Sequence, residues 1–130
     1  MIGVSPAAAD AAAPRASGTL EAHYAPRTPV ALVERKRLPL VLRQLAAAKR
    51  RVALIQRTAH SFPEVAAQCV LPDAPDGFAH DLYAALRNMD AANADLILIE
   101  SPPNLDAWQG VNDRLRRAAH DSAGVLEELL

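Results

Sequence analysis

The stretch Asp95-Leu96-Ile97-Leu98-Ile99-Glu100 decides the fold class, because it predicts a strand that is buried on both faces. Four apolar residues follow one another between two carboxylates, and the turn formers Ser101-Pro102-Pro103 end the run. Continuous apolar runs of this length are typical of parallel sheets, in which helices cover both faces. The sequence therefore predicts a sheet strand enclosed between helical layers.

Three more segments predict strands. Thr28 to Val33 is apolar and β-branched, and its proline suits the start of a strand. Arg51 to Arg57 contains a second nearly continuous apolar run. Val65 to Leu71 is a weaker strand candidate that ends at Pro72. The sequence thus predicts about four strands.

Helical spacing of apolar residues predicts a helix after most of these strands. The first runs from Arg35 to Lys49 and keeps Pro39 in its opening turn. The second runs from Phe78 to Ala92, with Asp76 or Gly77 as its cap. The third runs from about Leu105 to His120, and on it Asp113 can pair with Arg116 or Arg117.

This alternation predicts an α/β fold: a Rossmann-like three-layer domain with a mostly parallel sheet and helices on both faces. Residues 1–27 are rich in alanine and proline and lack apolar periodicity, so they predict an interdomain linker or extended arm. We expect the domain over residues 28–121. Residues 122–130 form a tail, predicted as a short extra turn or a frayed end.

Composition is that of an ordinary globular protein, with 51% hydrophobic and 22% charged residues. Cys69 is the only cysteine, so no internal disulfide can form and a reducing cytoplasm fits best. It lies in an apolar stretch, where a buried and inert thiol is expected. No apolar run approaches the ~20 residues that span a bilayer, so we expect no membrane partner.

The motifs of independent chemistry are missing. The five glycines cannot be arranged into a dinucleotide fingerprint or a phosphate-binding loop. The four histidines have no chelating spacing, so no metal site is predicted. His60 and Ser61 lie in one loop without a nucleophile elbow or a third triad member. The sequence therefore predicts no catalytic residue, and an independent nucleotide hydrolase is disfavoured.

Charge is distributed unevenly although the net charge is only -1. Residues 1–60 hold ten Lys/Arg against three Asp/Glu, and residues 61–130 hold four against twelve. This asymmetry is compatible with solvated helix faces, and also with a small tRNA-binding or RNA-binding module. The latter would use the basic residues Arg35, Lys36, Arg37, Lys49, Arg50 and Arg51.

Several ordered motifs resemble one enzyme family. The segment from Ala16 to Val30 is similar to the linker signature Ser/Ala-Pro-Gly-x-x-x-x-His-Tyr-Ala-Pro of two-domain threonylcarbamoyl-adenylate synthases of the Sua-five type. The signature residues are Ser17, where the family usually has proline, with Gly18, His23, Tyr24 and Pro26. The helix from Asp81 to Arg87 with Asp90, the strand 95–100 and the segment Val111 to Ala119 resemble later motifs in order.

The resemblance implies an accessory C-terminal domain whose partner is a YrdC-like catalytic domain, normally in the same chain. The complete enzyme joins ATP, threonine and bicarbonate into threonylcarbamoyl-adenylate for tRNA modification, using a divalent metal such as magnesium. We expect 130 residues to leave no room for that larger domain, and therefore no ATP, cofactor or catalysis here. The resemblance also implies that His23 and Tyr24 contact the nucleotide or close the site as a lid. The alternative is that Tyr24 packs on the accessory domain.

Overall fold

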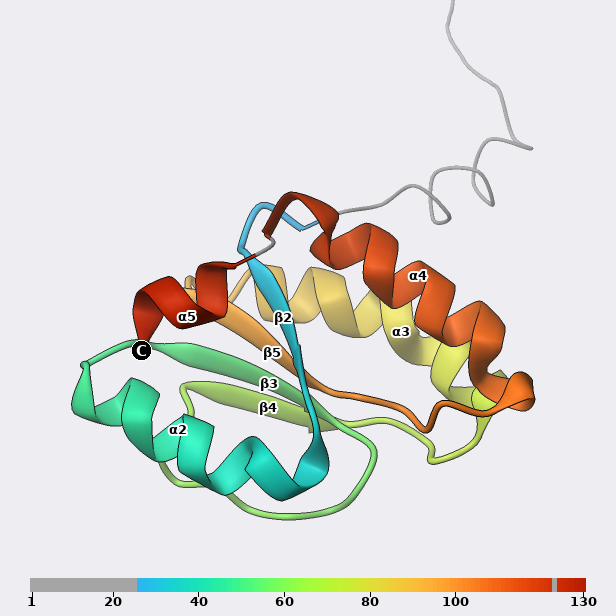
Figure 1. Cartoon of the computed structure of the whole chain (residues 1–130), viewed down its shortest axis with the longest axis horizontal. Coiled ribbons are helices and arrows are strands. Elements are labelled where there is room, and N and C mark those ends of the chain that lie inside the picture. Colours follow the sequence, from blue (N-terminus) through green and yellow to red (C-terminus); the bar gives the residue numbers. More distant parts are fainter. Residues whose placement is uncertain (1–25, 123) are drawn as a thin grey trace, which may run out of the picture.

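The sheet is four-stranded, parallel throughout and ordered β2-β5-β3-β4 (Figure 1). The computed structural model describes residues 26–122 and 124–130. The strands are β2 (Val30–Val33), β3 (Val52–Gln56), β4 (Ala67–Val70) and β5 (Leu96–Glu100). The helices are α2 (Leu38–Ala47), α3 (Pro75–Asp90), α4 (Gln109–Ala119) and α5 (Val125–Leu129). The predicted α/β class and parallel sheet are confirmed.

The side chains of each strand alternate between two cores. In β3, Ala53 and Ile55 pack toward α3 and α4, whereas Val52 and Leu54 pack toward α2 and α5. In β5 the same alternation separates Ile97 and Ile99 from the leucines on either side of them. Figure 1 shows α3 and α4 on one face of the sheet and α2 and α5 on the other. The three predicted layers are therefore present.

The connections between strands explain which face each helix covers. The chain passes from β2 to β3 through α2, and from β4 back to β5 through α3, in the opposite direction across the sheet. Right-handed crossovers that run in opposite directions must cover opposite faces. Residues 57–66 join β3 to β4 without a helix, and their Phe62 and Val65 pack on the α2 side.

The predicted helix boundaries need corrections. The prediction that Asp76 or Gly77 caps α3 is wrong, because both lie inside its first turn. The helix begins at Pro75, whose fixed φ suits the first helical position. The first and third helices open with 3-10 turns, Arg35–Arg37 and Asp106–Trp108. The predicted pair of Asp113 with Arg116 on α4 is confirmed.

The final residues pack on the sheet. A 3-10 turn, His120–Ser122, follows α4, and Leu126 of α5 is 6% exposed in the core on the α2 side. Of the two outcomes expected for residues 122–130, the structure therefore contains the extra helical turn. No helix within the described residues is both long and apolar enough to cross a membrane.

Candidate functional site

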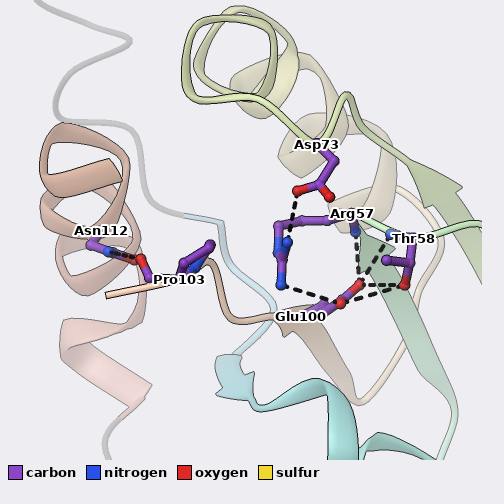
Figure 2. Close-up of polar contacts among 6 residues, drawn as sticks. All are labelled: Arg57, Thr58, Asp73, Glu100, Pro103 and Asn112. Atoms are coloured by element: carbon purple, nitrogen blue, oxygen red, sulfur yellow. Dashed lines mark hydrogen bonds and ion pairs between the residues drawn. The ribbon is translucent and has the colours of Figure 1, made fainter. Parts of the chain in front are cut away.

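The carboxyl ends of the strands are the place to look for a site, because open α/β sheets bind their ligands there. β3 and β5 are neighbours, and both end at this edge. The residues at these two ends are Gln56, Arg57 and Thr58 after β3, and Glu100 at the end of β5. Figure 2 shows Arg57, Thr58 and Glu100 converging with Asp73, and we call these four residues the carboxyl-edge cluster.

Glu100 is the centre of the cluster and is fully buried. Its Oε1 accepts hydrogen bonds from the backbone N–H of Arg57 at 2.8 Å and of Thr58 at 3.2 Å. Thr58 Oγ1 donates to the same oxygen at 3.1 Å. The carboxylate therefore caps the end of the neighbouring strand, where the ladder offers no further acceptor.

Arg57 supplies the positive charge of the cluster. Its Nη1 lies 2.7 Å from Asp73 Oδ1, and its Nη2 lies 3.6 Å from Glu100 Oε2 (Figure 2). The guanidinium also lies over the ring of Trp108, 5.9 Å from its centroid, within the range of a cation–π contact. The cation of Arg57 thus joins two carboxylates and an aromatic ring from three different segments.

The contacts of the cluster suit a structural role rather than a catalytic one. A general base needs a carboxylate that can accept a substrate proton, but Glu100 already accepts several hydrogen bonds. A phosphate site needs a cation that is not already neutralised, but Arg57 is paired with two carboxylates. We conclude that this edge is closed by its own ion pairs.

The residues of this edge do not fit ATP or a metal ion. Phosphate binding at a parallel sheet uses glycines that bring backbone N–H groups close to the ligand. Within the described part of the chain the glycines are Gly77, Gly110 and Gly124, none of which directly follows a strand. Nor do three or more His, Cys, Asp or Glu side chains gather there as a metal site would require.

Asn112 fixes the loop that leaves the cluster. Its Nδ2 donates to the carbonyl oxygen of Pro103 at 3.1 Å and so ties the loop after β5 to α4 (Figure 2). Asn112 belongs to the segment Val111 to Ala119, the last motif of the family resemblance. The structure gives this residue a loop-holding role.

Of the predicted linker residues, the structure describes only Pro26 and Arg27. Ser17, Gly18, His23 and Tyr24 lie outside the described residues, so their roles stay predictions. Pro26 is the first described residue and is half-buried. Cys69 is half-buried on β4, and burial raises the pKa of its thiol, so little thiolate forms at neutral pH.

The basic residues of the alternative RNA-binding prediction form two groups at opposite ends of α2. The helix has 10 residues, which corresponds to a separation of about 15 Å. Arg35, Lys36 and Arg37 precede it, and Arg35 Nη2 lies 3.4 Å from His60 Nε2. After it, Arg50 and Arg51 donate to the carbonyl oxygens of Leu129, Asn93 and Ala92. A single basic patch is therefore absent from these six residues.

The carboxyl-edge cluster was not predicted. The sequence does show its components, an Arg-Thr pair after one buried strand and a glutamate at the end of another. Bringing them together requires knowing that β3 and β5 are neighbours. The order of strands in a parallel sheet cannot be read from the apolar pattern of each strand.

Fold and site together define a parallel α/β domain in which salt bridges of its own occupy the carboxyl edge of the sheet. The sequence model of the threonylcarbamoyl-AMP synthase C-terminal domain matches residues 2–120, and the chain belongs to this family. The chain matches no curated protein sequence. The resemblance inferred from the motifs is thereby confirmed.

Two solved structures from P. abyssi have the same fold. One is Sua5 complexed with L-threonine, with a TM-score of 0.67 and 26% identity over 77% of this chain. The other is a Sua5 variant with an adjacent histidine and tyrosine replaced by alanine, with a TM-score of 0.64 and 25% identity over 75% of this chain. The chain covers only 30% and 29% of these two proteins.

Proposed function

We propose that this chain is the accessory domain of a threonylcarbamoyl-AMP synthase and that residues 1–27 act as a lid on a YrdC-like catalytic domain. The observation that carries the proposal is the family match over residues 2–120, which includes both the domain and the segment before it. The matched structures are more than three times as long as the aligned part, which leaves the chemistry to a separate region.

The division of labour agrees with the closed carboxyl edge. ATP, threonine and bicarbonate would react on the catalytic domain to give threonylcarbamoyl-adenylate for tRNA modification, and magnesium would act there too. Arg57 and Glu100 are paired within this domain, so they have no role in that chemistry. We expect the chain to be inactive alone and to work in the cytoplasm, where the tRNA modification would take place.

His23 and Tyr24 are the residues with which the lid would reach the nucleotide. An aromatic ring and an imidazole can stack on a base and donate hydrogen bonds. One matched P. abyssi structure is a variant in which an adjacent histidine and tyrosine were both replaced by alanine. This supports the choice of His23 and Tyr24 as the lid residues. A lid of this kind excludes water and controls product release.

The test is pyrophosphate release by a separately produced catalytic domain with and without this chain. We expect the wild-type chain to be silent alone and to change the turnover of the catalytic domain. Tyr24→Ala should remove that change and Tyr24→Phe should keep most of it if ring stacking dominates. Tyr83→Phe, on the half-buried tyrosine of α3, is the matched control. No difference between the mixture and the catalytic domain alone would count against the lid.

A further inference from the structure

The entry of the chain into the domain is held at four consecutive residues by three different elements. Arg27 and Thr28 bind Asp90 at the end of α3. The carbonyl oxygen of Pro29 accepts from the N–H of Ile97 in β5, and the N–H of Val30 donates to Ser122 Oγ after α4. Partners this distant in sequence fix both the position and the direction of the entering chain.

Asp90 makes the contacts closest to the predicted linker. Its Oδ1 accepts from Thr28 N–H at 2.9 Å and from Thr28 Oγ1 at 2.7 Å, and its Oδ2 accepts from Arg27 N–H at 3.2 Å. Two successive backbone N–H groups and one hydroxyl therefore point at one carboxylate. This geometry holds the backbone itself, independently of the side chain of Arg27.

The position of Asp90 on its helix is unfavourable for a carboxylate. It is the last residue of α3, where the helix dipole is negative and favours cations. Within the helix the residue therefore has an electrostatic cost, and the hydrogen bonds from Arg27 and Thr28 offset it. Asp90 also closes the family motif that begins at Asp81, whose apolar members, such as Leu82 and Leu86, are buried in the core.

We infer that Asp90 is a positioning residue that anchors the domain end of the linker at Arg27 and Thr28. This inference rests on the proposed lid function for its consequence in catalysis. The anchoring of Arg27 and Thr28 by Asp90 rests on the hydrogen bonds alone. An anchored end limits the region that the preceding residues can reach, and so raises the fraction of time in which a tethered lid faces its target.

The first test is amide hydrogen exchange of Thr28 in the full chain, followed by NMR. We expect Asp90→Ala to speed the exchange of this amide about tenfold or more, since the loss of one backbone hydrogen bond changes a local opening equilibrium on that scale. Thr28→Val keeps the N–H but removes the hydroxyl, so it should give a smaller increase. Unchanged exchange in Asp90→Ala would overturn the anchor.

Asp95→Ala is the matched control for these variants. Asp95 lines the same surface hollow as Asp90 and also accepts a backbone hydrogen bond, from the N–H of Arg51 at 2.8 Å. Its partner lies in the segment before β3 rather than at the linker. The control should therefore lose similar stability in urea while the exchange of the Thr28 amide stays at the wild-type rate.

The second test is pyrophosphate release in the mixture with the catalytic domain. Asp90→Ala should remove the effect of the chain on turnover as Tyr24→Ala does, whereas Asp95→Ala should retain it. If Tyr24→Ala has an effect and Asp90→Ala has none, the positioning role is overturned. If no variant changes turnover, the lid proposal fails, and the Thr28 exchange alone then decides whether the anchor exists.

Discussion

The carboxylate of Glu100 and the backbone N–H of Arg57 join the carboxyl ends of two neighbouring strands through a hydrogen bond of 2.8 Å. At the other end of β5, Asp95 Oδ2 accepts from the N–H of Arg51 at 2.8 Å. The two carboxylates that bracket β5 in the sequence therefore both fasten β5 to the segment flanking β3. The first is buried and the second is exposed, which makes their energetic weights very different.

Glu100→Ala should lower the free energy of unfolding by about 3 to 5 kcal/mol, because it leaves Arg57 with Asp73 as its only carboxylate partner and leaves two partly buried N–H groups without an acceptor. Asp95→Ala should cost only about 1 kcal/mol. Urea unfolding followed by circular dichroism measures both. Glu100→Gln, whose amide oxygen can still accept, should fall between wild type and Glu100→Ala. Equal losses for Glu100→Ala and Asp95→Ala would contradict this ranking.

Two helical glycines should respond oppositely to alanine. Gly110 in α4 has open space around an added Cβ, so Gly110→Ala should stabilise the protein by about 0.5 to 1 kcal/mol. At Gly77 an added Cβ would lie 2.8 Å from Pro72 Cβ, and the ring of proline cannot rotate away. Gly77→Ala should therefore destabilise, despite the higher helix propensity of alanine. Thermal unfolding of the two variants side by side decides the sign.

The stability that Asp90 contributes should disappear in acid. Partial burial by itself would raise the pKa of Asp90, but the hydrogen bonds from Thr28 and Arg27 and the charge of Arg27 outweigh it and lower the pKa from its ordinary value. A carboxyl group whose pKa is lower when folded stabilises above its unfolded pKa and loses that contribution as pH falls through the folded value.

Urea midpoints of wild type and Asp90→Ala over a range of pH test this directly. The difference between the two proteins should be constant near neutrality and shrink at pH values below the ordinary aspartate range. A difference that persists unchanged into strong acid would show that the ionised carboxylate is not what holds the linker end.

Cys69 should react slowly with thiol reagents in the folded protein. Burial raises the pKa of its thiol, so the reactive thiolate is scarce at neutral pH. The rate of modification should rise with pH across the alkaline range and reach the rate of a free thiol in urea. Because this is the only cysteine, the absorbance of a released thiol chromophore reports it without interference. Fast modification near pH 7 would mean that β4 opens readily.

Binding of tRNA, the alternative function, should be weak and depend only shallowly on salt. The two basic groups lie at opposite ends of α2, and Arg50 and Arg51 already bind carbonyl oxygens. Few phosphates can then be neutralised together, and the slope of affinity against salt counts those contacts. Filter binding at several salt concentrations measures the slope. A steep slope that Arg35→Glu and Lys49→Glu each reduce would instead favour the RNA-binding module.

The apolar patterns predicted the strands well because each pattern is local. Leu96 to Ile99 and Val52 to Ile55 are buried on both faces, so every residue of these runs had to be apolar. The boundaries shifted where a backbone preference outweighed composition, as with Pro75, which starts α3 before the residues that were expected to cap it.

The polar contacts between distant segments could not be predicted because they depend on which segments become neighbours. Asp90 meets Thr28 across 62 residues of sequence, and Glu100 meets Arg57 across 43. The sequence separation of neither pair indicates that its two residues are in contact. The motif residues Asp90 and Asn112 were recognised by resemblance, and only the structure assigns their partners as the chain entry and the loop after β5.

The pairing of β2 with β5 also determines the order in which the domain can be completed during synthesis. Val30 is paired with Ile97, so the strand next to the linker has no neighbour in the sheet until the strand around residue 97 has left the ribosome. A nascent chain that has exposed β2, β3 and β4 still lacks the central strand between β2 and β3. β2 is the first strand to be synthesised, but it is among the last to gain its neighbour in the sheet. A ribosome that pauses before residue 97 therefore leaves the apolar edges of β2 and β3 unpaired.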